Sequence, residues 1–354
     1  MAEQNQNPRL GTVGGQAVLE GLMMKSRKTY SVALRMPDDS IKVITSPVTS
    51  VRTKYKILNL PIIRGFVNMI ETLILSYKTL MLSTETFGLD EEEEEETKFE
   101  KWLNEKFGKS LYDVIMVIAT ILGFALGFGI FFVLPALISG WTNDLCGGSL
   151  PKPVESVIEG VIKIGIFILY LWAVSNMKDI RRTFEYHGAE HKTIFCYESG
   201  EELTVENVKK FQRFHPRCGT SFIFVLLLIG IFFSILLKLI PGISSIRILY
   251  IALKILILPI VVGVGFEFIM YAGKHDNACV RIFSAPGLWM QRLTTREPDG
   301  KQIEVAIKAL KTALPEVFPE EIVTEEPEKP EEKTEGKEEP LPENTDGETP
   351  HSHG

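Results

Sequence analysis

Four long runs of apolar residues alternate with polar stretches along the chain. They cover residues 114–138, 160–177, 221–237 and 248–271, with Lys163 in the second run and Lys254 and Glu267 in the fourth. An α-helix rises about 1.5 Å per residue, so a run of about 20 apolar residues crosses the roughly 30 Å apolar core of a bilayer. The pattern predicts a mainly α, polytopic membrane protein with about four transmembrane helices.

The N-terminal part has a different period. Residues 30–36 and 41–46 alternate apolar and polar side chains around the turn-forming segment 37–40, which is typical of a β-hairpin. Three glycines, Gly14, Gly15 and Gly21, lie just before it and indicate tight turns or close backbone approach. Residues 1–60 are therefore predicted to form a small β-rich segment.

Residues 62–84 have a helical pattern in which polar side chains interrupt the apolar ones. The interruptions are Arg64, Asn68, Glu71, Ser76 and Lys78. This mixture favours an amphipathic helix that lies against the membrane or the helix bundle. A buried helix of a soluble subdomain fits the pattern about as well. The rest of segment 61–112 holds the acidic run 90–96, expected as a solvated loop, and a short charged helix over 99–109.

The charge is unevenly distributed over the 354 residues. The formal net charge is −7, but the acidic residues concentrate in 90–96 and in the tail 316–354, and the remainder is mildly basic. The tail is rich in Pro, Glu, Lys and Thr, has little to bury, and is predicted to be disordered. Four cysteines without regular spacing do not suggest a disulfide framework. The N-terminus does not resemble a signal peptide, and no nucleic-acid partner is expected.

Lysine and arginine residues predict the orientation of the spans. They are abundant before the first span, between the second and third, and after the fourth, whereas residues 141–156 contain only Lys152. The positive-inside rule then places both termini in the cytoplasm. The predicted order is spans one and two in 113–178, a cytoplasmic loop in 179–218, spans three and four in 219–275, and a membrane-docked cytoplasmic segment in 276–315. The lipid bilayer is the expected partner.

The loop between the second and third spans contains the string H-x-x-E-H. His187, Glu190 and His191 share one face of a helix, because positions three and four apart are helical neighbours. Two imidazoles at this spacing can hold one divalent metal, and a carboxylate beside them can bind the metal or act as a base on its water. The same string occurs in one class of zinc peptidases, although it can also arise by chance.

The predicted topology brings further metal-ligand side chains to the same side of the membrane. His215 and Cys218 lie just before the third span. At the end of the fourth span, Glu267, Tyr271 and His275 follow each other at helical spacing. A carboxylate inside a span is costly unless it is paired, and it is a functional candidate by default. A shared metal site is one interpretation; a purely structural polar network, with Glu267 paired to Lys163 or an arginine, is the other.

Several longer motifs resemble a known family. These motifs are Gly14–Met24, Glu185–Lys192, His215–Ser221 and residues 266–275. They resemble the YqhQ-like family of uncharacterised bacterial membrane proteins, over about residues 10–310. The resemblance implies a multi-pass protein of the bacterial plasma membrane. Members of the family are commonly labelled predicted metal-dependent enzymes, on the same histidines. The resemblance also implies that Gln16, Glu20 and Arg64 belong to the functional surface, and it supplies no substrate.

Three functional hypotheses follow. The first is a metal-dependent hydrolase, with His187, His191 and either His215 or Cys218 holding a divalent metal, zinc as first choice. Glu190 or Glu267 would be the general base, and Tyr271 or Arg217 would stabilise developing charge. The substrate would be a membrane-protein segment or a lipid.

The second hypothesis is a membrane scaffold or assembly factor. Its metal site would be structural and closed, with His187, His191, His215 and Cys218 as four ligands, or it would be a polar network without metal. The third is a transporter, and it ranks last because the spans contain few polar residues and no internal repeat.

Overall fold

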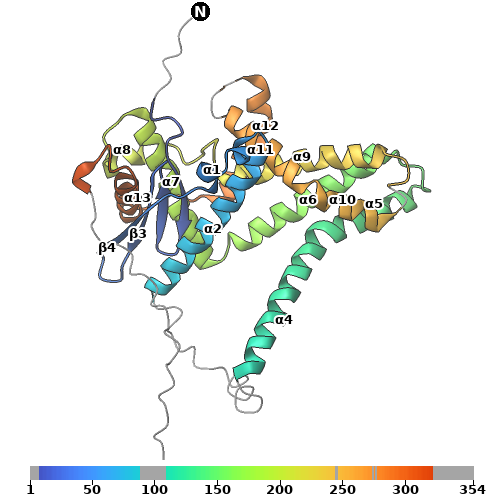
Figure 1. Cartoon of the computed structure of the whole chain (residues 1–354), viewed down its shortest axis with the longest axis horizontal. Helices are drawn as coiled ribbons and strands as arrows, with labels where there is room; N and C mark the ends of the chain where they lie inside the picture. The colour runs from blue at the N-terminus through green and yellow to red at the C-terminus, as the bar shows by residue number, and fades with distance from the viewer. Residues whose placement is uncertain (1–7, 88–108, 244–245, 273–274, 276, 322–354) are drawn as a thin grey trace, which may run out of the picture.

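The computed structural model describes residues 8–87, 109–243, 246–272, 275 and 277–321. The chain forms a small sheet domain beside a group of long apolar helices (Figure 1). The prediction of a mainly α protein with a small β-rich N-terminal part is confirmed. The predictions for the acidic run 90–96, for residues 99–108 and for most of the tail (322–354) lie outside the described residues.

The N-terminal strands form one four-stranded antiparallel sheet in the order β1-β2-β3-β4. The strands are β1 (Gly14–Val18), β2 (Gly21–Lys25), β3 (Thr29–Arg35) and β4 (Ile41–Pro47). The predicted hairpin is confirmed as β3 and β4, with Arg35 opposite Ile41. The glycine-rich segment before it forms a second hairpin, in which Gly15 lies opposite Met24.

Both faces of the sheet are covered, because side chains alternate between faces along a strand. Leu22, Met24 and Ala33 join a core with helices α7 (Lys178–Ser199), α8 (Val205–Lys209) and α13 (Gly300–Ala313). Met23 and Val32 point the other way and pack with Leu75 and Leu82 of helix α2 (Ile63–Thr86). A capping box at Asp299 and Gln302 begins α13. The turn η3 (Pro319–Glu321) ends the described chain.

Three helices are long and apolar enough to cross a membrane, or four if one bent pair counts as a single span. The first span, Ile121–Leu145, comprises part of α4 (Lys109–Phe128), the π-helical turn η2 (Gly129–Val133) and α5 (Leu134–Leu145). The others are α6 (Lys152–Val174), α9 (Gly219–Leu239) and the pair α10 (Arg247–Leu256) and α11 (Leu258–Ala272), bent by 42°. This arrangement is compatible with a multi-pass membrane protein and agrees with the four predicted spans.

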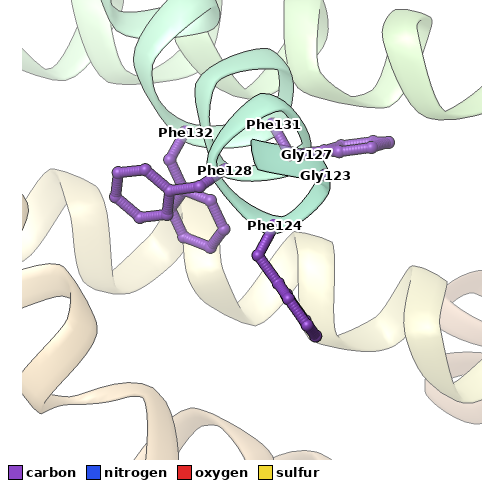
Figure 2. A pocket seen from close by; sticks show the side chains of 6 residues that line it. All are labelled: Gly123, Phe124, Gly127, Phe128, Phe131 and Phe132. Carbon is purple, nitrogen blue, oxygen red and sulfur yellow. The ribbon is translucent and has the colours of Figure 1, made fainter. Parts of the chain in front are cut away.

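Helix α4 diverges from the other spans (Figure 1). It carries two glycines four residues apart, Gly123 and Gly127, and a Cβ added at either position meets nothing within 4 Å. Together with Phe124, Phe128, Phe131 and Phe132 these glycines line an open pocket of about 610 Å³. Figure 2 shows the phenyl rings of this pocket fanning outward from the helix. The glycine pair therefore packs against no other helix among the described residues.

One prediction about the spans was wrong. Helix α6 begins at Lys152, ahead of the predicted start at residue 160, so Glu155 and Glu159 also belong to an apolar helix. The candidate span helices therefore contain Glu155 and Glu159 as well as Glu267. Glu159 binds the Lys254 ammonium group and accepts a 3.2 Å hydrogen bond from the Tyr250 hydroxyl. The sequence interpretation missed this network because the glutamate lies on α6, whereas the lysine and the tyrosine lie on α10.

Helix α2 connects the sheet domain to the spans. Before it, the chain forms the short helices α1 (Val51–Lys54) and η1 (Lys56–Asn59). The N-terminal turn of α2 packs on α11, where a Cβ added at Gly65 would lie 2.6 Å from the Phe266 Cβ. Helix α12 (Ala278–Thr294) packs along α9 and returns the chain to the sheet domain. The docking of residues 276–315 on the membrane stays a prediction.

Candidate metal centre

The H-x-x-E-H segment lies in the middle of α7, between the sheet domain and the spans. His187, Glu190 and His191 share one face of this helix, as their spacing predicts. The opposite face, including Tyr186 and Ala189, is buried in the core of the sheet domain. The burial of that face fixes the rotation of the helix. The two imidazoles then contact the segment 213–218 and the end of α12, and Glu190 lies against β1.

A backbone carbonyl orients each imidazole of this segment. His187 Nδ1 lies 2.8 Å from the Thr294 carbonyl oxygen, and His191 Nδ1 lies 2.5 Å from that of Arg213. A carbonyl can only accept, so each Nδ1 carries a proton, and the lone pair of the neutral ring lies on Nε2. Metal-binding histidines are commonly held in this way by a partner on the other ring nitrogen.

A glycine makes the first of these contacts possible. Gly188 lies under the segment that follows α12: a Cβ at this position would be 2.0 Å from the Arg296 carbonyl oxygen. The Arg296 amide in turn donates a 2.8 Å hydrogen bond to the Phe184 carbonyl oxygen. The close crossing of the two backbones brings the Thr294 carbonyl within reach of His187.

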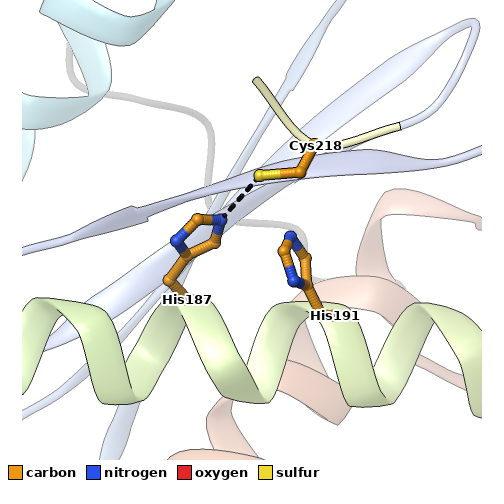
Figure 3. A group of neighbouring side chains, drawn as sticks. All are labelled: His187, His191 and Cys218. Atoms are coloured by element: carbon orange, nitrogen blue, oxygen red, sulfur yellow. Dashed lines mark hydrogen bonds between the residues drawn. The ribbon is translucent and has the colours of Figure 1, made fainter. Parts of the chain in front are cut away.

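Cys218 completes the group from a distant part of the chain. It is buried at the N-cap of α9, and its Sγ lies 3.2 Å from His187 Nε2. One ligand atom from each of His187, His191 and Cys218 lies within 4.8 Å of the other two (Figure 3). Tetrahedral ligation with bonds of about 2.0–2.3 Å separates ligand atoms by about 3.3–3.6 Å. Small side-chain shifts would therefore allow these three atoms to bind a single ion.

The thiol and the first imidazole also change each other's ionisation. Burial opposes the thiolate, but His187 and His191 hold the pKa of the Cys218 thiol well below its usual value. Burial also disfavours the charged His187 ring, but Cys218, followed by Glu190, raises its pKa to about 9. Without a cation, the site therefore holds a thiolate–imidazolium pair, and Cys218 has the ionised form that metals bind.

Glu190 lies beside this group with an unused acceptor. Its side chain is buried, and its Oε2 atom has no hydrogen-bond partner. Burial raises the pKa of Glu190, while His187 and His191 oppose the rise. Strand β1 covers the carboxylate closely, because a Cβ at Gly15 would lie 2.9 Å from the Glu190 Cδ. A buried carboxylate oxygen without a donor fits a neighbouring cation or its bound water.

The comparisons with known proteins place this chain in a family. Residues 60–316 match the model of the family described as "Protein of unknown function (DUF1385)". The chain is 34% identical over 302 residues to the "Uncharacterized protein YqhQ" of Bacillus subtilis (strain 168), over 85% of this chain and 92% of that protein. The chain belongs to the DUF1385 family. The predicted resemblance is thereby confirmed. No solved structure matches this DUF1385 protein.

His215, a predicted ligand, lies next to the group and faces elsewhere. Its ring centroid is 5.5 Å from that of His191, and its Nε2 is 3.9 Å from Glu198 Oε2. Burial lowers the pKa of His215, partly countered by Glu198. The Gln291 side chain bonds both the amide and the carbonyl of His215 at 2.7 Å. His215 thus belongs to a second layer around the DUF1385 site.

Arg217 and Glu198 form the outer part of that layer. Arg217, predicted to stabilise developing charge, binds the Glu198 carboxylate, which also accepts a 2.8 Å hydrogen bond from the Gly11 amide. Burial raises the pKa of Glu198, but His215, Gly11 and Arg217 together lower it below its usual value. The sequence interpretation missed Glu198, although it follows His191 by seven positions and so shares its helix face.

The other predicted site residues of the DUF1385 protein lie apart from the three ligands. Glu267 forms an ion pair with Arg64, whose Nε lies 2.7 Å from Oε1. Tyr271 and His275 stack on each other with ring centroids 4.1 Å apart. The pairing of Glu267 with an arginine matches the structural alternative considered for it. None of these four residues belongs to the group of potential metal ligands in the described chain.

Gln16 and Glu20 lie in the first hairpin of the sheet. Gln16 pairs with Met23 across β1 and β2. Glu20 occupies the turn with φ 49°, binds the Arg182 guanidinium group and lines a pocket of about 390 Å³. Its carboxylate also accepts a 3.4 Å hydrogen bond from Tyr186, the residue before His187. The hairpin therefore contacts α7 at both Glu20 and Gly15.

Proposed function

We propose that this DUF1385 protein is a membrane-bound metal-dependent hydrolase. His187, His191 and Cys218 would hold a divalent ion, with zinc the first choice for a nitrogen and sulfur donor set. The observation that carries the proposal is the convergence of these three ligand atoms beside the unpartnered Oε2 of Glu190. Three protein ligands leave one position open, as in catalytic zinc sites.

Each residue of the proposed centre has a separate role. When bound, the ion would polarise a substrate carbonyl or phosphoryl oxygen and acidify water. His187 and His191 present Nε2 because Thr294 and Arg213 hold the opposite nitrogen. Glu190 would act as the general base, because its buried Oε2 has no hydrogen-bond donor and lies beside the ligand group. Glu267, paired with Arg64, is the weaker candidate for this role.

We further propose that the centre faces the cytoplasm at the membrane surface. The ligands lie on α7 and at the N-terminus of α9, the end of that span beside the sheet domain. Basic residues before α9 and after α11 support this orientation through the positive-inside rule. The substrate class that fits this position is a lipid or a membrane-protein segment.

The metal content of the purified protein tests the first part of the proposal. The protein is prepared in mild detergent without chelators, and bound metals are measured by mass spectrometry. We expect about one zinc-type ion per chain, and a loss of at least about tenfold in His191→Ala and Cys218→Ser. Matched controls are His275→Ala and Cys146→Ser, which lie outside the group. Wild-type protein without metal after this preparation would overturn the proposal.

A closed structural site is the second candidate, because the free Oε2 of Glu190 could itself become a fourth ligand. The protein would then be a scaffold or assembly factor whose metal fastens α7 to α9. Substitution of the metal by cobalt(II) distinguishes an open catalytic site from a closed structural one. An open site should change its visible spectrum when azide is added, whereas a site closed by Glu190 should not respond until Glu190→Gln opens it.

Hydrolysis tests the reaction. Wild-type and Glu190→Gln proteins, both loaded with metal, are incubated with bacterial lipid extract and with membrane-protein fragments. We expect product from the wild type and at least about a hundredfold slower release from Glu190→Gln. Equal rates in the two proteins would remove Glu190 from the reaction.

A further inference from the structure

The segment from α1 to the middle of α2 exposes an unusual number of large apolar side chains. The exposed residues are Val51, Tyr55, Ile57, Leu60, Ile62, Ile63, Ile70, Leu73, Ile74, Tyr77 and Leu80, each 38–66% accessible. Contiguous apolar surface of this kind marks a binding surface in a folded protein. We propose that this surface is an in-plane membrane anchor, inserted into a leaflet rich in anionic phospholipid.

The exposed residues of α2 form one face. At about 100° per residue, positions 63, 70, 73, 74, 77 and 80 fall within an arc of about 120°. The side chains that pack on the sheet, Leu75 and Leu82, fall on the opposite side of the helix. The two faces therefore serve different partners, and the sheet domain leaves the outward face of α2 uncovered.

The start of α2 is fixed against a span, which sets the depth of this face. A Cβ at Gly263 of α11 would lie 2.4 Å from the Ile62 carbonyl oxygen, so the two backbones are in contact. Arg64 then binds Glu267 of the same helix through two nitrogen atoms. The apolar face of α2 consequently begins at its contact with α11, a helix that also exposes apolar side chains, including Leu258 and Ile260.

An uncommon turn produces this placement. Ile62 has φ 69° and ψ −53°, and the Ile63 amide bonds the Pro61 carbonyl oxygen at 2.8 Å, which defines a γ-turn. Positive φ is unfavourable for a β-branched residue and persists only where surrounding contacts require it. Here the turn directs α2 away from η1. At the same point Ile62 packs against Gly263 and Arg64 binds Glu267.

The charges of the segment match an acidic lipid surface. Residues 51–80 contain five basic side chains and the single acid Glu71. Arg64 pairs with Glu267 and Arg52 with Glu71, which leaves Lys54, Lys56 and Lys78 to face the lipid. Glu71 is engaged internally, since it accepts 2.8 Å hydrogen bonds from the Ser50 hydroxyl and the Val51 amide. Basic residues around an apolar face are typical of helices that lie in the interface of anionic membranes. Tyr55 and Tyr77 are residues that the same interface favours.

Site-specific photocrosslinking in the full-length protein tests the anchor. A benzophenone amino acid replaces Tyr77 or Leu73, the protein is reconstituted in vesicles of phosphatidylglycerol and phosphatidylethanolamine, and adducts are identified by mass spectrometry after illumination. We expect lipid adducts at both positions. The matched control is position 304 on α13, where the Glu304 side chain is about half exposed on the sheet domain; it should give at least about tenfold fewer.

The other outcomes are decisive. Adducts between two copies of the chain, or with the chain itself, would make this face a protein interface and overturn the anchor. Adducts no more frequent than at position 304 would make it a solvent-facing surface. Lys54→Glu with Lys56→Glu should also lower the ratio of phosphatidylglycerol to phosphatidylethanolamine adducts at position 77. Metal content, measured in the same samples, should stay unchanged and keeps this test separate from the proposed metal centre.

Discussion

Two buried polar clusters lie at opposite ends of α9, and they differ in how their charged groups are paired. At its C-terminal end, Lys238 lies 3.3 Å from Glu155 and 3.8 Å from Glu159, and Glu159 also binds Lys254. Every acid there faces a cation. At the N-terminal end, Cys218 meets His187 and His191, and the neighbouring Glu190 keeps one oxygen without a donor.

The difference separates a structural network from a candidate site. Opposite charges in the first cluster neutralise each other and hold α6, α9 and α10 together without help from a ligand. The second cluster consists of donor atoms whose lone pairs converge, and such atoms repel each other unless a proton or a cation lies between them. Buried charge alone is therefore a poor guide to function, whereas convergent unpaired ligand atoms are a better one.

The largest expected effect on stability comes from breaking the ion-pair network around Glu159. Glu159→Ala would leave Lys254 buried without its carboxylate, and removing one partner of a buried ion pair costs about 3–5 kcal/mol. Unfolding of the protein in lipid or detergent, followed by steric trapping or by denaturant, measures this loss. Glu316→Ala, which removes an exposed ion pair with Lys28, should cost less than about 1 kcal/mol. Equal losses in both variants would contradict the distinction.

The next effect concerns the backbone crossing at the proposed centre. Gly188→Ala places a methyl group against the Arg296 carbonyl and should destabilise the protein by about 1–3 kcal/mol. It should also weaken metal binding by about tenfold, because the Thr294 carbonyl would move away from His187. Metal titration and denaturant unfolding measure the two effects. Gly14→Ala is the matched control, since a Cβ there meets nothing within 4 Å.

The effect of pH on the stability of the metal-stripped protein should be smaller than the effect of Gly188→Ala. The pKa of His187 is raised to about 9, above its ordinary value of 6.5, by the Cys218 thiolate against the effect of burial. Its contribution to stability is therefore complete below pH 6.5 and is lost as the pH rises through 9. The lowered pKa of the Cys218 thiol contributes in the opposite sense, because its share of the stability is gained as the pH rises toward the usual thiol value. The two contributions cancel between pH 7 and pH 9, so stability should change there by less than about 1 kcal/mol. Unfolding of the stripped protein at pH 7 and pH 9 measures the change, and a change of more than about 2 kcal/mol would contradict the thiolate–imidazolium pair.

The smallest effect is expected at Glu190. In metal-stripped protein, Glu190→Gln removes a charge that has an unpartnered oxygen, so stability should change by less than about 1 kcal/mol or rise slightly. The same substitution should reduce activity strongly in metal-loaded protein. A large loss of stability without metal would mean that Glu190 belongs to a structural network, like Glu159.

Much of the fold follows from local patterns. Apolar runs of about 20 residues predicted the spans, and alternation around residues 37–40 predicted the hairpin of β3 and β4. The strands β1 and β2 were harder to predict from the sequence. Their glycines are required by close contacts with α7 and β3, which a local pattern does not show. The acids at 155 and 159 fell outside the predicted second span because a charge interrupts an apolar pattern even where a lysine on another helix neutralises it.

The candidate site was only partly predictable for a related reason. His187, Glu190 and His191 are adjacent on one helix face, and their spacing alone places them together. Cys218 and His215 are three residues apart and were equally plausible ligands from the sequence. Their side chains diverge because Gln291 holds the His215 backbone and Glu198 faces its ring, whereas Cys218 occupies the N-cap of α9.

By itself, the sequence determined the apolar helices, the hairpin and the helix face that carries two imidazoles and a carboxylate, because these depend on periodicity within one segment. Tertiary structure alone decided which cysteine joins that face, which carbonyls set the imidazole tautomers, and why glycines are needed at positions 15 and 188. Those features depend on separations of a few ångströms between segments far apart in the chain, and no local pattern encodes such distances.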